Sequence, residues 1–208
     1  MRTLTLCITA LASLFLLSGC ATMELQTQAK RTRTLTLPPE VLNDKRVFVR
    51  VSGTEASILE LEAPLKQALS ERHVTVVSSI DDATLYLHVN TLFANNLKEA
   101  TNINAALMTG TIAGAAASVN NSGKDSILIG IGVALAMGVA DKALADETYR
   151  AVVDVSLTER NRASQEKPWK KAQETRVLVE AVKMNLDTTE AKPILEQKVV
   201  SQIADIFK

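Results

Sequence analysis

The sequence predicts an α+β fold: an antiparallel sheet with two packed helices and an inserted glycine-rich apolar helical hairpin. Segments in which apolar and polar residues alternate occur on both sides of residues 103–140, which favours a sheet formed across that insertion. Two further segments have apolar residues at helical spacing. Residues 103–140 are almost entirely apolar or small, and they form the predicted hairpin.

Alternation predicts the strands, because successive residues of a strand point to opposite faces. The alternating or β-branched segments are residues 47–51, 74–77, 85–93, 149–160 and 176–186. In the third of these, Leu85, Leu87, Val89 and Phe93 are expected on the core side. The last segment alternates imperfectly, which indicates a β-bulge.

Helical spacing predicts one helix within residues 55–72 and a second at the end of the chain. Pro64 interrupts the first pattern, since proline removes a backbone donor. Thr188 or Thr189 is expected to cap the second helix. Pro193 fits that helix only if it lies near the first turn.

The first twenty residues predict export and lipid attachment. Arg2 is followed by an uncharged apolar run over residues 4–17, which is too short to span a bilayer and is typical of a signal peptide. The run ends in the sequence Leu17, Ser18, Gly19 and Cys20. This sequence resembles the bacterial lipobox, which implies cleavage before Cys20 and an N-acyl diacylglyceryl lipid on its thiol and amino group. The alternative is an ordinary secretory signal with a chance cysteine.

These features predict a signal peptide at 1–19, a lipidated N-terminus and tether at 20–39, and a folded domain at 40–208. Residues 21–37 are polar with little periodicity, which favours a tether. Ala21 follows the lipobox, and the absence of aspartate there resembles the default for outer-membrane sorting. Several acyl chains on one cysteine would make a lasting anchor in outer-membrane lipid.

Composition restricts the class of protein further. The chain has 23 basic and 23 acidic residues, and no basic stripe that would indicate a nucleic-acid partner. Its two cysteines are Cys7, inside the signal peptide, and Cys20, so the mature protein has no thiol for a disulfide. The histidines, His73 and His88, are far apart in sequence, and no metal or cofactor motif occurs. We therefore expect no metal, no cofactor other than the covalent lipid, and no enzyme activity.

Small residues recur every four positions in the insertion, where a helix would place them on one face. They are Ala106, Gly110, Gly114 and Ser118 in the first arm, and Gly130, Ala134 and Gly138 in the second. Such faces let helices pack closely in a membrane, and hairpins side by side would form a ring-like homo-oligomer. The alternative is a soluble, buried hairpin. The polar tip between the arms comprises Asn120, Asn121, Ser122, Gly123, Lys124 and Asp125.

Two polar motifs have structural alternatives. Asp81 and Asp82 form a carboxylate pair, for which a turn between strands is the favoured interpretation. Residues 167–171 join the chain's one tryptophan, Trp169, to a basic run. Such a segment fits either a membrane surface or an exposed loop.

The chain resembles the TraT family of outer-membrane lipoproteins. The resemblance rests on the lipobox, residues 137–149, 154–160 and 175–177, Lys-Met-Asn-Leu at 183–186 and Glu-Ala-Lys-Pro-Ile-Leu at 190–195. It implies a surface-exposed homo-oligomer that blocks redundant conjugative DNA transfer and is linked to complement resistance. It also implies that tip residues 120–125 recognise a donor-cell surface or pilus component. A structural envelope lipoprotein or a periplasmic activator without exclusion activity is the alternative.

Overall fold

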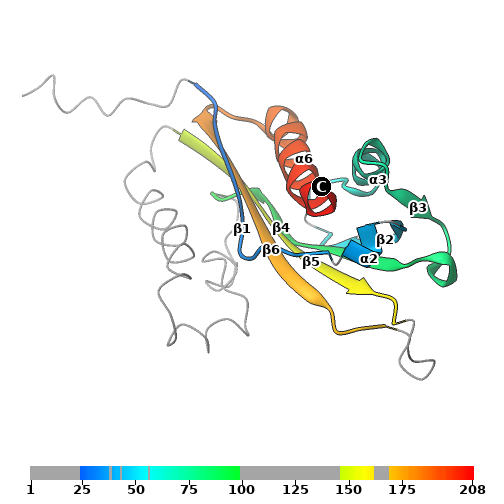
Figure 1. The fold of residues 1–208 in the computed structure, drawn as a ribbon. Coiled ribbons are helices and arrows are strands. Elements are labelled where there is room, and N and C mark those ends of the chain that lie inside the picture. The colour runs from blue at the N-terminus through cyan, green and yellow to red at the C-terminus, as the bar shows by residue number, and fades with distance from the viewer. Residues whose placement is uncertain (1–23, 38, 43, 56, 99–145, 162–168) are drawn as a thin grey trace, which may run out of the picture.

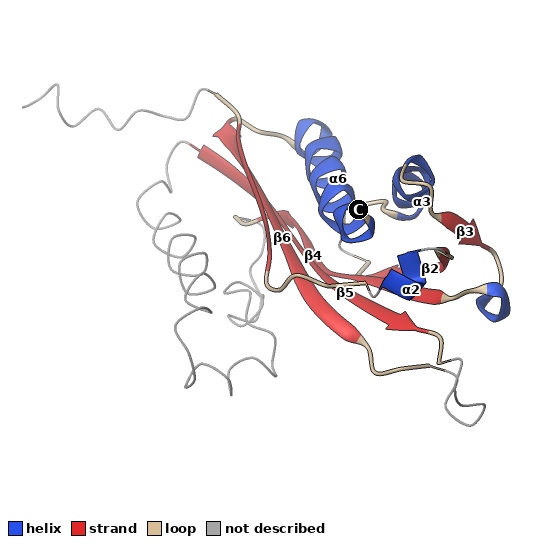
Figure 2. Cartoon of the chain, viewed as in Figure 1, coloured by secondary structure: helices blue, strands red, loops and turns tan. Residues whose placement is uncertain are grey.

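The computed structural model describes residues 24–37, 39–42, 44–55, 57–98, 146–161 and 169–208. These residues form a six-stranded sheet with the strand order β1-β6-β5-β4-β2-β3. Figures 1 and 2 show the twisted sheet with α3 and α6 on the same face. The elements are β1 Gln26–Arg31, α2 Pro39–Leu42, β2 Arg46–Gly53, α3 Glu62–Glu71, β3 Thr75–Val77, η1 Ile80–Asp82, β4 Leu85–Asn96, β5 Asp146–Glu159, β6 Gln173–Met184, α6 Thr188–Ala204 and η2 Asp205–Phe207.

The predicted fold class was wrong. The sheet is mixed, because β2 runs parallel to both β3 and β4, whereas the other pairs are antiparallel. The described chain is mostly β-structure, with two helices longer than one turn. Alternation identifies a strand but carries no information on its direction, which here is set by α3 leading the chain from β2 back to β3. The predicted apolar hairpin at 103–140 lies outside the described residues.

The core lies between the sheet and the two helices. Leu65 and Leu69 of α3, and Leu195, Val199 and Ile203 of α6, are completely buried. They pack on the alternate side chains of the strands that face them, as the predicted alternation requires. Each such side chain contributes about 1.5–3 kcal/mol when fully buried. This layer holds most of the buried apolar side chains of the described residues.

Strand β1 lies within the segment predicted as a polar tether. It pairs antiparallel with β6, from Gln26 opposite Val182 to Arg31 opposite Val177. Leu35 and Leu37, which follow the strand, are buried in the core. The predicted tether therefore contains an edge strand of the sheet.

A bulge in β4 changes which side chains face the core. Leu85, Leu87 and Val89 are fully buried there, as predicted. The register with β5 shifts between Thr91 and Phe93, so that Phe93 is only partly buried and Ala94 takes the core position. The core position predicted for Phe93 was therefore wrong. The pairing of β5 with β6 is continuous, so the predicted bulge in the last strand is not present.

The helix starts differ from the predicted ones. Helix α3 begins at Glu62, which places Pro64 in the first turn, where backbone N–H groups have no partner within the helix. The N-cap of α6 is Asp187, whose Oδ1 accepts a hydrogen bond of 2.9 Å from the Glu190 backbone N–H. Neither predicted threonine caps this helix. Pro193 lies inside α6, beyond its first turn.

Candidate functional site

The face of the sheet opposite the helices carries a group of ring side chains, which we call the aromatic row: Phe48, Tyr86, His88 and Trp169. The ring centroids of Phe48 and Tyr86 lie 5.9 Å apart, and those of Tyr86 and His88 lie 6.3 Å apart with nearly parallel planes. Trp169 tilts against Tyr86 at 6.2 Å. All four side chains are partly exposed, so the row is a part of the surface that is stiffened by ring contacts.

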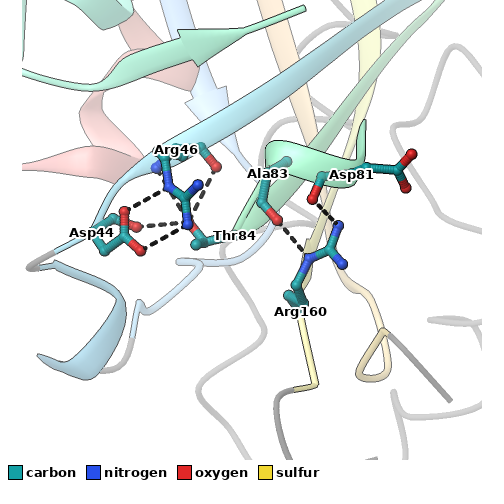
Figure 3. A network of polar contacts seen from close by, with 6 residues as sticks. All are labelled: Asp44, Arg46, Asp81, Ala83, Thr84 and Arg160. Atoms are coloured by element: carbon teal, nitrogen blue, oxygen red, sulfur yellow. Dashed lines mark hydrogen bonds and ion pairs between the residues drawn. The ribbon is translucent and has the colours of Figure 1, made fainter. Parts of the chain in front are cut away.

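Arg160 holds one end of this row in place. Its guanidinium carbon lies 4.8 Å from the centre of the Trp169 ring. Its nitrogens donate to the backbone carbonyls of Ile80, Asp81 and Ala83, at 2.6, 3.0 and 2.6 Å. Figure 3 shows the contacts with Asp81 and Ala83. Asp81 and Asp82 lie in η1, between β3 and β4, so the turn predicted there is confirmed. One cation joins this turn to the segment that holds the tryptophan.

A second polar group, also drawn in Figure 3, joins the starts of β2 and β4. The Thr84 hydroxyl donates to the Asp44 carbonyl at 2.6 Å and accepts from the Arg46 backbone N–H at 3.1 Å. The Arg46 guanidinium pairs with the Asp44 carboxylate at 2.9 Å, and this hydrogen bond raises the pKa of Arg46. Thr84 is buried, whereas the side chains of Arg46 and Asp44 are 45% and 39% exposed. The hydrogen bonds of Thr84 fix the start of β4 beside the start of β2.

Ser52, His88 and Asn90 form a hydrogen-bonded set that superficially resembles a nucleophile beside its base. The Ser52 hydroxyl lies 2.9 Å from His88 Nε2 and donates to Asn90 Oδ1 at 2.9 Å. A serine hydroxyl has one proton, so with that proton given to Asn90 the histidine Nε2 must itself be the donor. In this arrangement His88 cannot accept a proton from Ser52. The set is a cross-strand polar contact between β2 and β4.

The same face of β5 and β6 carries two ion pairs. Arg176 binds both carboxylate oxygens of Asp154, at 2.6 and 2.8 Å, and Arg150 is paired with Glu180. Both arginines are almost completely buried. Sequence reasoning missed these pairs, although the unbroken apolar run at 151–153 was a signal that β5 is buried on both faces.

The insertion leaves and re-enters the sheet on adjacent strands. The Leu97 N–H donates to the Thr148 carbonyl at 2.9 Å, directly beyond the last pair of β4 and β5. Glu147 accepts from Asn96 Nδ2 at 2.7 Å and from Lys98 Nζ at 2.6 Å. These hydrogen bonds, that from Asn96 first, lower the pKa of Glu147. We call these residues, Asn96 to Lys98 with Glu147 and Thr148, the insertion clamp.

The described N-terminus lies at the same end of the sheet as the insertion clamp. Gln26, the first residue of β1, pairs with Val182, and Val182 pairs in turn with Thr148 of the clamp. Figure 1 shows the blue start of β1 beside the yellow-green start of β5. The chain that follows the predicted lipidation site and the chain that enters the insertion therefore meet at one end of the sheet.

The functional residues predicted from sequence fall outside the described part of the chain. They are the lipobox at 17–20, the small-residue faces at 106–118 and 130–138, and the polar tip at 120–125. Within the described residues, no three histidine, cysteine, aspartate or glutamate side chains come together to hold a metal ion. In the same residues, no helix is long and apolar enough to span a membrane.

The fold and these sites define a β-rich single-sheet domain with a long insertion at the end where its N-terminus enters. Residues 24–171 match the family model described as enterobacterial TraT complement resistance protein, and the chain belongs to this TraT family. A TraT complement resistance protein of Escherichia coli is 29% identical over an alignment of 234 positions, which covers 95% of both chains. A second TraT complement resistance protein, from Escherichia coli strain K12, is 29% identical over an alignment of 245 positions, which covers 100% of both chains. The resemblance inferred from sequence is confirmed.

Proposed function

We propose that this protein is a non-enzymatic outer-membrane lipoprotein, acylated at Cys20, that mediates surface exclusion of redundant conjugative DNA transfer. In this proposal it acts as a ring-like homo-oligomer and contributes to complement resistance, the property for which its relatives are named. The insertion between β4 and β5 is the part that meets the membrane, and its polar residues 120–125 recognise the partner.

The observation that supports this proposal is the shared end of the sheet. Cys20 lies four residues before Glu24, the first described residue, so the connecting chain spans at most roughly 14 Å. A lipid on Cys20 would hold the start of β1 close to the bilayer. The insertion clamp lies at that same end, so the apolar insertion would leave the domain on its membrane side.

Labelling on intact cells tests the orientation. We would introduce Ser122→Cys and treat cells with a membrane-impermeant maleimide. Cys7 and Cys20 are the only natural cysteines, and the proposal removes one with the signal peptide and acylates the other. Labelling of intact cells is expected. Labelling only after the outer membrane is opened would favour a structural or periplasmic activator role instead.

Mating efficiency tests exclusion itself. Recipients that produce the protein should receive a related conjugative plasmid less often than recipients that lack it, and Cys20→Ala should weaken this effect. Equal transfer of the cognate plasmid into recipients with and without the protein would contradict the exclusion role. For the ring, Gly114→Leu is expected to reduce the particle size of detergent-extracted protein, and an unchanged particle would remove the assembly from the proposal.

A further inference from the structure

A groove of about 440 Å³ lies beside the edge of the sheet at the start of β6. It is lined by two chain segments, residues 33–35 after β1 and residues 171–174 leading into β6. Arg33 and Lys171 are its two cations, and both are exposed. We call this feature the basic groove. Its volume lies within the range of small-ligand sites, roughly 300–1,000 Å³.

The cations of the basic groove differ from most others in their bonding. Most described arginine and lysine side chains have an ion pair or a hydrogen bond to a carbonyl. Within the described residues, those with neither are Lys30, Arg31, Arg33, Arg50, Lys171 and Lys198. All but Arg50 and Lys198 lie in the groove or on β1, which leads to it. Four of these six cations therefore lie in the basic groove or on the strand next to it.

Side chains of β6 hold the wall of the groove in place. The Thr175 hydroxyl accepts from the Arg33 N–H at 3.1 Å and lies 2.8 Å from the Arg33 carbonyl, to which it donates. The Gln173 side-chain amide exchanges two hydrogen bonds with the Thr36 backbone, at 3.1 and 3.4 Å. The backbone that bears the Arg33 guanidinium is therefore fixed before any ligand arrives, which lowers the entropy cost of binding.

We infer that the basic groove binds the carboxylates of an extended acidic peptide segment. The planar guanidinium of Arg33 can take a carboxylate through two parallel hydrogen bonds, and Lys171 supplies a second positive charge across the groove. Lys30 and Arg31, the last two residues of β1, add one positive charge to each face of the strand that leads to the groove. Glu174 also lines the groove, and its negative charge disfavours a dense polyphosphate more than a peptide whose carboxylates stand on separate side chains.

The position of the groove excludes one competing ligand. Strand β6 has 12 residues, so at about 3.3 Å per residue the groove lies roughly 35 Å from the end of the sheet that carries the insertion clamp. Given the proposed membrane attachment at that end, lipid headgroups of the same membrane do not reach the groove. The inference otherwise stands apart from the proposed exclusion role.

The test uses the full chain in detergent and a fluorescein-labelled hexaglutamate peptide, followed by fluorescence anisotropy at low salt. The variant R33Q/K171Q should bind at least tenfold more weakly than the unchanged protein. The matched control is R50Q/K198Q, which removes the same charge from two unpaired cations elsewhere and should change affinity less than twofold. All four positions are exposed, so both variants should keep the thermal unfolding midpoint of the unchanged protein.

Three results would overturn the inference. One is the absence of hexaglutamate binding at millimolar concentration, and another is equal weakening in both variants, which would indicate an unspecific charge effect. The third is inorganic tripolyphosphate displacing the peptide at concentrations below the peptide's own dissociation constant, which would assign the groove to phosphate polymers. None of these measurements depends on plasmid transfer or cell-surface labelling, so failure here is distinguishable from failure of the proposed function.

Discussion

The guanidinium of Arg150 lies 2.8 Å from the carboxylate of Glu180, and the two side chains are only 2% and 10% exposed. The residues are paired on adjacent strands, β5 and β6, on the face of the sheet away from the helices. The contact is charge-assisted and almost free of solvent. Removal of a buried charge from water is costly, and this cost is offset only while both partners are present.

Arg150→Met is expected to destabilise the protein by about 3–5 kcal/mol, because it leaves the Glu180 carboxylate buried without its cation. Urea unfolding followed by circular dichroism would measure the change. The double variant R150M/E180L removes both charges and should recover most of the lost stability. A double variant as unstable as the sum of the two single variants would show that the pair itself contributes little.

Arg160→Lys is expected to lower stability by about 1–2 kcal/mol, because lysine cannot reach three carbonyls and the Trp169 ring together. Trp169 is the chain's one tryptophan, so its fluorescence reports this contact directly. A red-shifted emission maximum should accompany the loss. An emission spectrum identical to that of the unchanged protein would mean that Arg160 does not hold the tryptophan.

The insertion clamp should make stability depend on pH through Glu147. Its pKa is lowered in the folded protein, so the stabilisation is complete above the usual value of 4.5 and is lost as the pH falls through the folded-state value. Thermal unfolding midpoints from pH 7 to pH 3 would measure this. The difference between the unchanged protein and Glu147→Gln should be largest near pH 7 and should shrink below about pH 4.5.

Lys98→Gln serves as the partner control for this titration. It removes one of the two hydrogen bonds that lower the Glu147 pKa and leaves the bond from Asn96. The midpoint difference between the unchanged protein and Lys98→Gln should therefore change less with pH than the difference between the unchanged protein and Glu147→Gln. A constant difference between unchanged protein and E147Q over the whole pH range would contradict the role given to Glu147.

Asp187→Ala should cost about 1 kcal/mol, because the first turn of α6 loses the side-chain acceptor of the Glu190 N–H. Asp187→Ser should retain most of the stability, since serine is also a good N-cap. Thr189→Ala provides the matched control within the same turn and should change stability by less than about 0.5 kcal/mol. A larger loss for the threonine variant would move the cap to the position predicted from sequence.

The elements that sequence predicted well are those with one buried face. Leu85 and Leu87 in β4, and Leu195 and Val199 in α6, gave clear periods of two and 3.6 residues because water lies on one side only. Strand β1 gave no such signal, since it is an edge strand whose exposed side chains are polar. The parallel pairing of β2 was also hidden, because strand direction depends on the connection through α3.

Prediction of the sites was limited in a different way. The partners Arg150 and Glu180 are 30 positions apart in sequence, and only the register of β5 with β6 brings them together. The basic groove likewise joins residues 33–35 to residues 171–174. Family membership, in contrast, was readable from contiguous motifs such as that at 190–195, because identity in short segments does not require knowledge of the fold.

The insertion clamp has a consequence for how such a domain can change over evolution and in the laboratory. Leu97 and Thr148 are joined by a backbone hydrogen bond, so the two ends of the intervening loop are already as close as the ends of a tight hairpin. A two-residue turn can close this gap without moving the register of β4 and β5. The 50 residues between Leu97 and Thr148 can therefore be shortened, lengthened or exchanged while the six-stranded sheet stays the same.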